Sequence, residues 1–207
     1  MMTMPLHLNK PALRVLGIAE SFVRSRQKSI LAGVVMRADM RVDGLAFARA
    51  LVGGDDATSA VLQIYKGLDR QDINAVLISG AVVSWFNIID IHAVHAGTGR
   101  PVVCLTYDES EGLEGYIREY FPGQEAKLAG YRRLGGRQRV RLKTGYDVFV
   151  RPVGATTDEA RILLNRFTRD GRIPEPVRLA RLAARAAAFE DEKKKPSLAL
   201  SEAGSSG

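Results

Sequence analysis

A run of basic residues between Ala126 and Tyr146 has the clearest chemical character in the sequence. It holds no acidic residue and seven basic ones, namely Lys127, Arg132, Arg133, Arg137, Arg139, Arg141 and Lys143. Residues two apart share one face of an extended strand, so three of the arginines would present their guanidinium groups together. Tyr131 and Tyr146 flank the arginines and are placed to stack on bases. The run predicts a surface that binds nucleic-acid phosphates without sequence preference. The alternative is a solvated loop or hairpin whose charges pair with acids elsewhere.

The overall charge points the same way. Among 207 residues, 30 are basic and 23 acidic, a net charge of +7, and the seven basic residues of the run account for all of it. Arginine outnumbers lysine by 22 to 8, which suits bidentate phosphate binding, although a GC-rich genome or a hot habitat would also favour it. The partner predicted from charge is DNA or RNA; an acidic protein, bound by a scaffold, is another reading.

Cellular context follows from simple exclusions. The single cysteine, Cys104, cannot form an internal disulfide and lies in an apolar segment typical of a core. No apolar run approaches the ~20 residues of a membrane span, and no signal peptide is evident. We therefore expect a cytoplasmic protein without a membrane partner.

Two other groups have residue types that could support chemistry. Asp90 and His92 form an Asp-x-His pair, and His95 follows three residues later on a predicted helix. Such spacing suits a metal or a proton shuttle, but a third ligand is missing, and local capping by Asp90 explains the pair equally well. Gly53 and Gly54 precede a helix, but the acids after them disfavour a phosphate loop.

Hydrophobic periodicity predicts an α/β fold. Three consecutive strands that suit an antiparallel meander precede alternating strands and helices, which require parallel pairing. The strands are expected at 13–19, 29–36, 41–52, 74–78, 101–105 and 146–150. The helices are expected at 53–68, 87–96, 110–120, 157–167 and 174–188. The domain plan is an N-terminal extension at 1–11, one domain at 12–190 and a disordered tail at 191–207.

Several of these segments together resemble a known family. They are the sequence Gly17-Ile-Ala-Glu-Ser21, the segments 77–80 and 85–90, and the proline-bounded motif at 171–181. The chain is similar to an uncharacterised archaeal family related to endonuclease V, over about residues 12–188. The resemblance implies a ribonuclease H-like mixed sheet, flanked by helices, and a nuclease that acts on deaminated, inosine-containing nucleic acid. It also places Trp85 and Phe86 at the edge that accommodates the base, where they stack or anchor the loop. Arg178, in the last motif, contacts phosphate or anchors the final helix.

Transferred residue by residue, the metal-ligand positions of the related nucleases fall at Ala19, Ser79 and Arg181. Such nucleases need carboxylates there, because carboxylates hold the Mg²⁺ or Mn²⁺ that activates water. Alanine offers no ligand, serine only a neutral oxygen, and arginine a positive charge. The resemblance therefore predicts the fold but argues against the usual catalytic centre, so no cofactor is expected unless the chain is active.

An active enzyme would need a displaced centre. Its candidate catalytic residues are Glu20, Asp55, Asp56 and Asp90. Glu20 follows Ala19 directly, so on a regular strand it points to the opposite face. Asp55 and Asp56 precede a helix, where N-capping is the simpler role. The leading hypothesis is a nucleic-acid-binding protein without the standard cleavage centre. The alternatives are a divalent-metal-dependent endonuclease with this displaced centre, and a scaffold protein.

Overall fold

A seven-stranded mixed sheet forms the centre of the computed structural model, which describes residue 8 and residues 10–193. The strand order is β3-β2-β1-β4-β7-β9-β8. The strands are β1 (Arg14–Ser21), β2 (Lys28–Arg37), β3 (Val42–Leu51), β4 (Ala75–Ser79), β7 (Val102–Thr106), β8 (Gln138–Arg141) and β9 (Asp147–Val153). β1, β2 and β3 pair antiparallel, whereas β4 is parallel to both β1 and β7. β9 then runs antiparallel to β7 and β8. The predicted meander followed by parallel pairing is confirmed.

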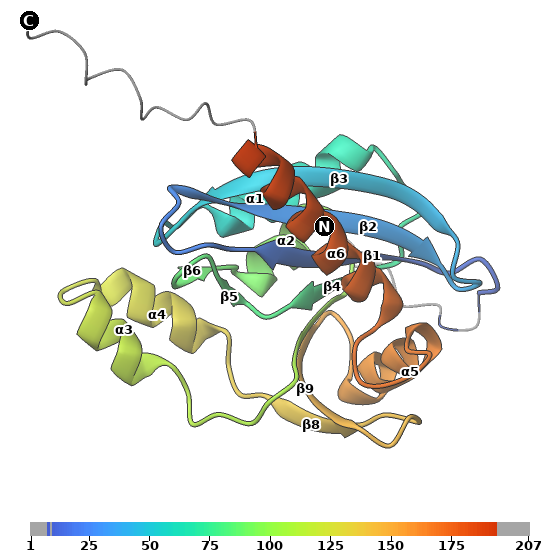
Figure 1. The fold of residues 1–207 in the computed structure, drawn as a ribbon. Coiled ribbons are helices and arrows are strands. Elements are labelled where there is room, and N and C mark those ends of the chain that lie inside the picture. Colours follow the sequence, from blue (N-terminus) through green and yellow to red (C-terminus); the bar gives the residue numbers. More distant parts are fainter. Residues whose placement is uncertain (1–7, 9, 194–207) are drawn as a thin grey trace, which may run out of the picture.

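Helices cover both faces of this sheet (Figure 1). On one face lie α1 (Ala57–Leu68) and α2 (Ile91–Thr98), which pack against Leu16 and Ile18 of β1. On the other face lie α5 (Thr157–Phe167) and α6 (Glu175–Lys193), which pack against Val15 and Ala19. Because β1 is buried on both sides, it is apolar along almost its whole length rather than alternating.

Smaller elements extend from the ends of the central strands. They are the two-stranded ribbon of β5 (Val82–Val83) and β6 (Asn87–Ile88), and the helices α3 (Glu114–Tyr120) and α4 (Glu125–Arg133). Figure 1 shows α3 and α4 at the left, beyond the sheet. None of the helices in the described ranges is long and apolar enough to cross a membrane.

The structure differs from the prediction at several boundaries. Residues 87–96 do not form one helix, because Asn87 and Ile88 pair as a strand and α2 starts only at Ile91. α1 begins at Ala57 rather than at Gly53, and α3 begins four residues after the predicted start at 110. α6 continues to Lys193 and so includes the first three residues of the segment predicted as a disordered tail. The rest of that tail, and residues 1–7 and 9 of the predicted extension, lie outside the described residues.

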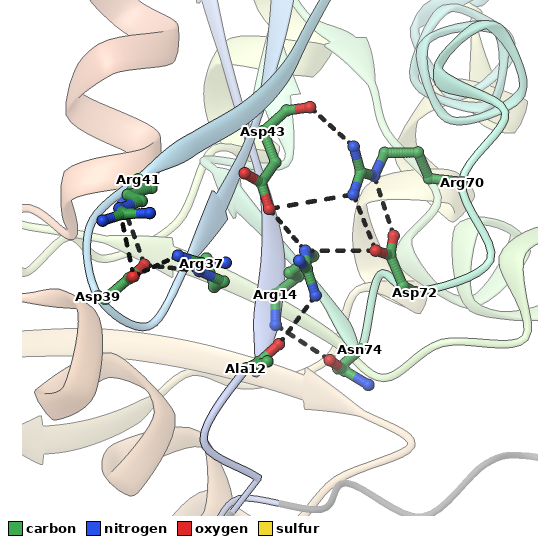
Figure 2. Close-up of polar contacts among 9 residues, drawn as sticks. All are labelled: Ala12, Arg14, Arg37, Asp39, Arg41, Asp43, Arg70, Asp72 and Asn74. Carbon is green, nitrogen blue, oxygen red and sulfur yellow. Dashed lines mark hydrogen bonds and ion pairs between the residues drawn. The ribbon is translucent and has the colours of Figure 1, made fainter.

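Ion pairs join neighbouring segments at the amino-terminal end of β1 (Figure 2). Arg14 contacts Asp43 of β3 at 2.6 Å and Asp72 at 3.3 Å, while Arg70 contacts the same Asp72 at 2.8 Å. The backbone N–H of Arg14 donates to the side chain of Asn74, which precedes β4. The network therefore joins β1 to the edge strand and to the start of β4, and its arginines are already neutralised.

β1 packs closely against α6 at Gly17. A Cβ atom at this position would lie 2.4 Å from the carbonyl carbon of Pro176. Backbone cannot yield as a flexible side chain does, so any side chain here would push α6 away from β1.

We expect Gly17→Ala to lower the free energy of unfolding by about 1–3 kcal/mol, the usual range for overpacking a core. The matched control is Gly67→Ala in α1, where an added Cβ meets nothing within 4 Å. Because glycine disfavours helix, that control should stabilise the protein, by up to about 1 kcal/mol. Denaturant unfolding measures both variants. Equal stabilities for the two would contradict the close packing of α6 on β1.

Candidate nucleic-acid interface

The three positions that the resemblance assigns to metal ligands lie together at the carboxyl ends of β1 and β4. Ile18 is paired with Ile78, which places Ala19 and Ser79 side by side on neighbouring strands. Ala19 is only 4% exposed and packs in the core beneath α6. Arg181 of α6 donates a hydrogen bond to Ser79 Oγ at 3.1 Å. The predicted placement of these positions therefore agrees with the fold.

A divalent cation does not fit the residues at this place. A guanidinium group donates where a ligand should accept, and its positive charge repels a cation. Across the described part of the chain, no group of three or more His, Cys, Asp and Glu side chains is arranged to hold a metal ion.

Tyr107 joins this cluster, although no pattern in the sequence had selected it. It follows β7 on the same face as Val103 and Leu105, which is the face that α6 covers. Its ring lies 5.5 Å from the Arg181 guanidinium and 5.6 Å from that of Arg172. Burial raises the pKa of Tyr107, and the nearby Ser79 and Arg181 only partly offset that effect. Side chains alternate between the two faces of a strand, so residue 107 is expected on the same face as residues 103 and 105. This alternation is the one sequence signal that could have identified Tyr107.

Of the four candidate acids, Asp55 and Asp90 line one pocket, of about 580 Å³, but no three of the four come together as metal ligands in the described residues. Glu20 points to the opposite face from Ala19, as expected for neighbours on a strand, and accepts hydrogen bonds from Ser84 N and Oγ. Asp55 pairs with Lys127 at 2.6 Å. The backbone N–H of Leu51 and the side-chain amide of Asn87 donate to the Asp56 carboxylate. Asp56 occupies the N-cap position of α1, but its side chain makes no capping hydrogen bond to that helix. Each of these acids therefore has a partner within the protein.

The Asp-x-His pair also has local roles. Asp90 is the N-cap of α2 and accepts hydrogen bonds from the backbone N–H groups of His92 and Ala93. His95 Nδ1 bonds to the carbonyl of Arg100 at 2.7 Å. This arrangement agrees with the capping alternative for Asp90.

An unusual turn follows β5. Ser84, Trp85 and Phe86 all have left-handed backbone conformations, with φ of 45°, 59° and 62°. Each such residue costs roughly 1–2 kcal/mol unless it is glycine. Contacts from separate elements hold the turn: Glu20 binds Ser84, Gly53 N donates to Ser84 O, and Lys127 Nζ donates to Phe86 O. Lys127 is buried by this role and is not part of the predicted phosphate-binding surface.

The turn presents aromatic rings next to α3. Trp85 lies 5.0 Å from Tyr120 and 5.3 Å from Phe86, measured between ring centroids. The guanidinium of Arg24 lies 3.8 Å from the Trp85 ring centroid. Tyr120 is 43% exposed and Arg24 is also exposed, so this aromatic cluster combines stacking surfaces with a cation at the surface of the protein.

The basic run is partly neutralised in the fold, which sequence alone did not reveal. Arg139 and Arg141 lie on one face of β8, as predicted, but both contact Asp147 of β9, at 2.5 and 3.2 Å. Arg137 precedes β8 and donates instead to Thr106 and to the carbonyls of Asp108 and Ser110. Arg137 thus lies outside the strand, 5.2 Å from the ring centroid of Phe149, the residue that pairs with Arg139, and a shared phosphate-binding row of the three arginines stays a prediction.

The remaining candidates divide between surface and structural positions. Arg132, Arg133, Lys143 and Tyr146 are exposed, with Arg133 3.8 Å from Asp90. The hydroxyl of Tyr131 accepts a hydrogen bond from Leu113 N. Arg178 forms an ion pair with Glu175 at 2.6 Å in the first turns of α6. This i,i+3 ion pair lies within α6 and does not join the helix to another element, so both roles expected for Arg178 stay predictions.

Comparison with known proteins identifies the family. The family model described as Endonuclease dU matches residues 11–188. The chain belongs to the Endonuclease dU family. A UPF0215 protein of Pyrobaculum aerophilum is 37% identical over 173 residues, which cover 83% of this chain and 92% of the relative. A UPF0215 protein of Thermococcus kodakarensis is 30% identical over 192 residues, covering 89% and 97%.

Solved structures of similar fold support this assignment. A protein of unknown function from Archaeoglobus fulgidus superposes with a TM-score of 0.74 at 26% identity, over 84% of this chain and 98% of that one. Human ENDOV gives a TM-score of 0.63 at 17% identity, over 92% of each chain. This Endonuclease dU family member thus has the ribonuclease H-like fold of the endonuclease V structures, and the predicted fold and relationship are confirmed.

Glu20 should make stability depend on pH. Burial raises the pKa of Glu20 above its ordinary value of 4.5, although the Ser84 hydrogen bonds act in the other direction. Between 4.5 and the raised pKa, the folded chain binds more protons than the unfolded chain. The free energy of unfolding should therefore fall as pH rises through that window. Glu20→Gln cannot titrate and should lose this contribution.

Denaturant unfolding between pH 4.5 and 7 tests this expectation as the difference between wild type and Glu20→Gln. Glu119→Gln, at an exposed position of α3, is the matched control and should keep the wild-type slope. A Glu20→Gln slope equal to that of wild type would show that the carboxyl group does not titrate differently on folding.

Proposed function

We propose that this Endonuclease dU family member binds nucleic acid and lacks the standard metal-dependent cleavage centre. The observation that carries the proposal is the hydrogen bond from Arg181 to Ser79, two positions that the family resemblance assigns to metal ligands. Such a site favours an anionic phosphate and disfavours a divalent cation.

Surface chemistry supports nucleic acid as the ligand. Arg139 and Arg141 share a single carboxylate, and their side chains remain 69% and 67% exposed. The pair therefore keeps a net positive charge that suits a phosphate backbone. Trp85 and Tyr120, with Arg24 beside them, offer rings for base stacking.

The names of related proteins support the same ligand class. The family description, Endonuclease dU, refers to a nuclease. A Ciona intestinalis endonuclease V with a TM-score of 0.59 and 12% identity was crystallised with DNA containing an inosine. Oligonucleotides that contain deoxyuridine or deoxyinosine are therefore the natural probes for this chain.

The alternative is an endonuclease with a displaced metal centre, and the family name is the observation that favours it. Glu20, Asp55, Asp56 and Asp90 remain its candidate residues, with Mg²⁺ or Mn²⁺ as cofactor. Such a centre would require these acids to exchange their present partners for a metal ion.

Binding is measurable through Trp85, because it is the only tryptophan in the chain. A deoxyuridine-containing single strand should quench its fluorescence at low salt, and the affinity should fall steeply as salt rises. The double variant Arg139→Ala/Arg141→Ala should bind more weakly and show a shallower salt dependence, because the log–log slope falls by roughly 0.7 for each phosphate that the protein no longer neutralises.

Arg41→Ala is the charge-matched control for one removed arginine, because Arg41 is exposed and directly precedes β3, at the edge of the sheet opposite to β8. It should leave the affinity and salt slope close to wild type. If the wild-type protein does not bind at low salt, nucleic acid is the wrong partner and a scaffold role becomes the better account.

Cleavage assays separate the two nucleic-acid hypotheses. We expect no cleavage of deoxyuridine- or deoxyinosine-containing DNA or RNA with either Mg²⁺ or Mn²⁺, as analysed on denaturing gels. Metal-dependent turnover that is abolished by Glu20→Gln or Asp56→Asn would instead establish the displaced centre.

A further inference from the structure

Two arginines and a tyrosine lie near Ser79, one of the positions that the family resemblance assigns to metal ligands. Arg181 comes from α6, Arg172 from the segment before it, and Tyr107 from the end of β7. Arg172 donates to the carbonyl of Tyr107 at 2.5 Å, and Arg181 to Ser79 at 3.1 Å. We call Ser79, Tyr107, Arg172 and Arg181 the arginine–tyrosine cluster.

The cluster carries net positive charge. Arg172 pairs with Asp108 at 3.0 Å, and that carboxylate is 83% exposed. Arg181 has no carboxylate partner within the part of the chain that the structure describes. A guanidinium group has five N–H donors, so its bond to Ser79 leaves donors for an anion.

Tyr107 adds an unused hydroxyl group. Its oxygen is buried and, within the described residues, has no hydrogen-bond partner, although Ser79 is nearby. A buried hydroxyl without a partner destabilises a protein. A ligand oxygen that reached this hydroxyl would remove that unfavourable state.

The ends of β1 and β4 beside the cluster carry no carboxylate at Ala19 and Ser79. Carboxylates at this strand end would repel a phosphate unless a cation lay between them. Because Ala19 on β1 and Ser79 on β4 carry no charge, no negative side chain at these two positions repels an anion that binds to the cluster.

We propose that the arginine–tyrosine cluster binds one phosphate group of a nucleic-acid strand directly, without a metal ion. Arg181 and Arg172 donate to the phosphate oxygens, and the Tyr107 hydroxyl donates to one of them. The proposal rests on the proposed function and assigns a specific site to it, separate from Arg139 and Arg141.

The test measures binding of a fluorescently labelled single-stranded oligodeoxynucleotide by anisotropy, with EDTA or with Mg²⁺. Wild type should bind equally well in both conditions. Arg181→Ala should weaken binding about tenfold or more and lower the salt slope by roughly 0.7. Arg41→Ala, which removes the same charge far from the cluster, should change neither quantity. Arg181→Lys should lie between wild type and Arg181→Ala, because it keeps the charge but loses the fork of donors.

Tyr107→Phe separates a ligand-binding role from a structural one. It removes a buried hydroxyl that has no partner among the described residues, so the melting temperature should be unchanged or higher. The affinity should nevertheless fall, by about threefold. A purely structural tyrosine would not lower the affinity while leaving the protein equally stable. This variant also keeps the proposal testable if Arg181→Ala fails to fold.

The failures of the two proposals are distinguishable. No wild-type binding at low salt would refute nucleic acid as the ligand. Wild-type binding with Arg181→Ala and Tyr107→Phe at full affinity would overturn the arginine–tyrosine cluster as a site and leave the proposed function intact. Binding that EDTA abolishes would show that a metal mediates it, and would overturn the metal-free site.

Discussion

The contact between Gly17 and Pro176 sets the geometry on which the candidate site depends. It brings the backbone of α6 against β1 without an intervening side chain. Arg181 lies five residues after Pro176 in α6. The position of α6 on β1 therefore determines where the Arg181 guanidinium group reaches Ser79. The parallel pairing of β1 with β4 supplies the other half of the arrangement, since it aligns the strand ends beneath that helix. The cluster is thus a product of tertiary packing around one glycine.

Sequence patterns predicted the sheet because burial leaves a direct mark on composition. The centres of β1, β4 and β7 are apolar, and helix α5 was predicted at its observed bounds, where Thr156 and Glu159 form a capping box. The shorter elements escaped prediction for a physical reason. β6 consists of only Asn87 and Ile88, and Asn87 is fully buried because it bonds to Leu51, Asp56 and Ala57. Its polar side chain reflects those long-range contacts, which no local pattern records.

Only part of the candidate site could be expected from the sequence. Ala19, Ser79 and Arg181 lie on neighbouring elements because β1 pairs with β4 and α6 covers both strands, while their equivalence to metal-ligand positions stays a prediction. Tyr107 was missed since its role depends on α6 covering that end of β7. The charge of the basic run was overestimated for a related reason: Asp147, just outside the run, lies opposite Arg139 and Arg141 only after β8 and β9 pair. A net charge read from sequence therefore says little about how much charge a surface offers.

The left-handed turn at Ser84, Trp85 and Phe86 has a consequence for how the indole ring is presented. Nothing in these residues favours the conformation, and in an isolated peptide they would leave it. The backbone of the turn is therefore held by Glu20 on β1, Gly53 before α1 and Lys127 on α4. The Trp85 ring itself is contacted by Arg24, Phe86 and Tyr120. Under the proposed function, a base that stacked on Trp85 would meet a turn that is already held in place, so little conformational entropy would be lost on binding. The conformational cost of the left-handed turn is incurred when the protein folds and not when a ligand binds.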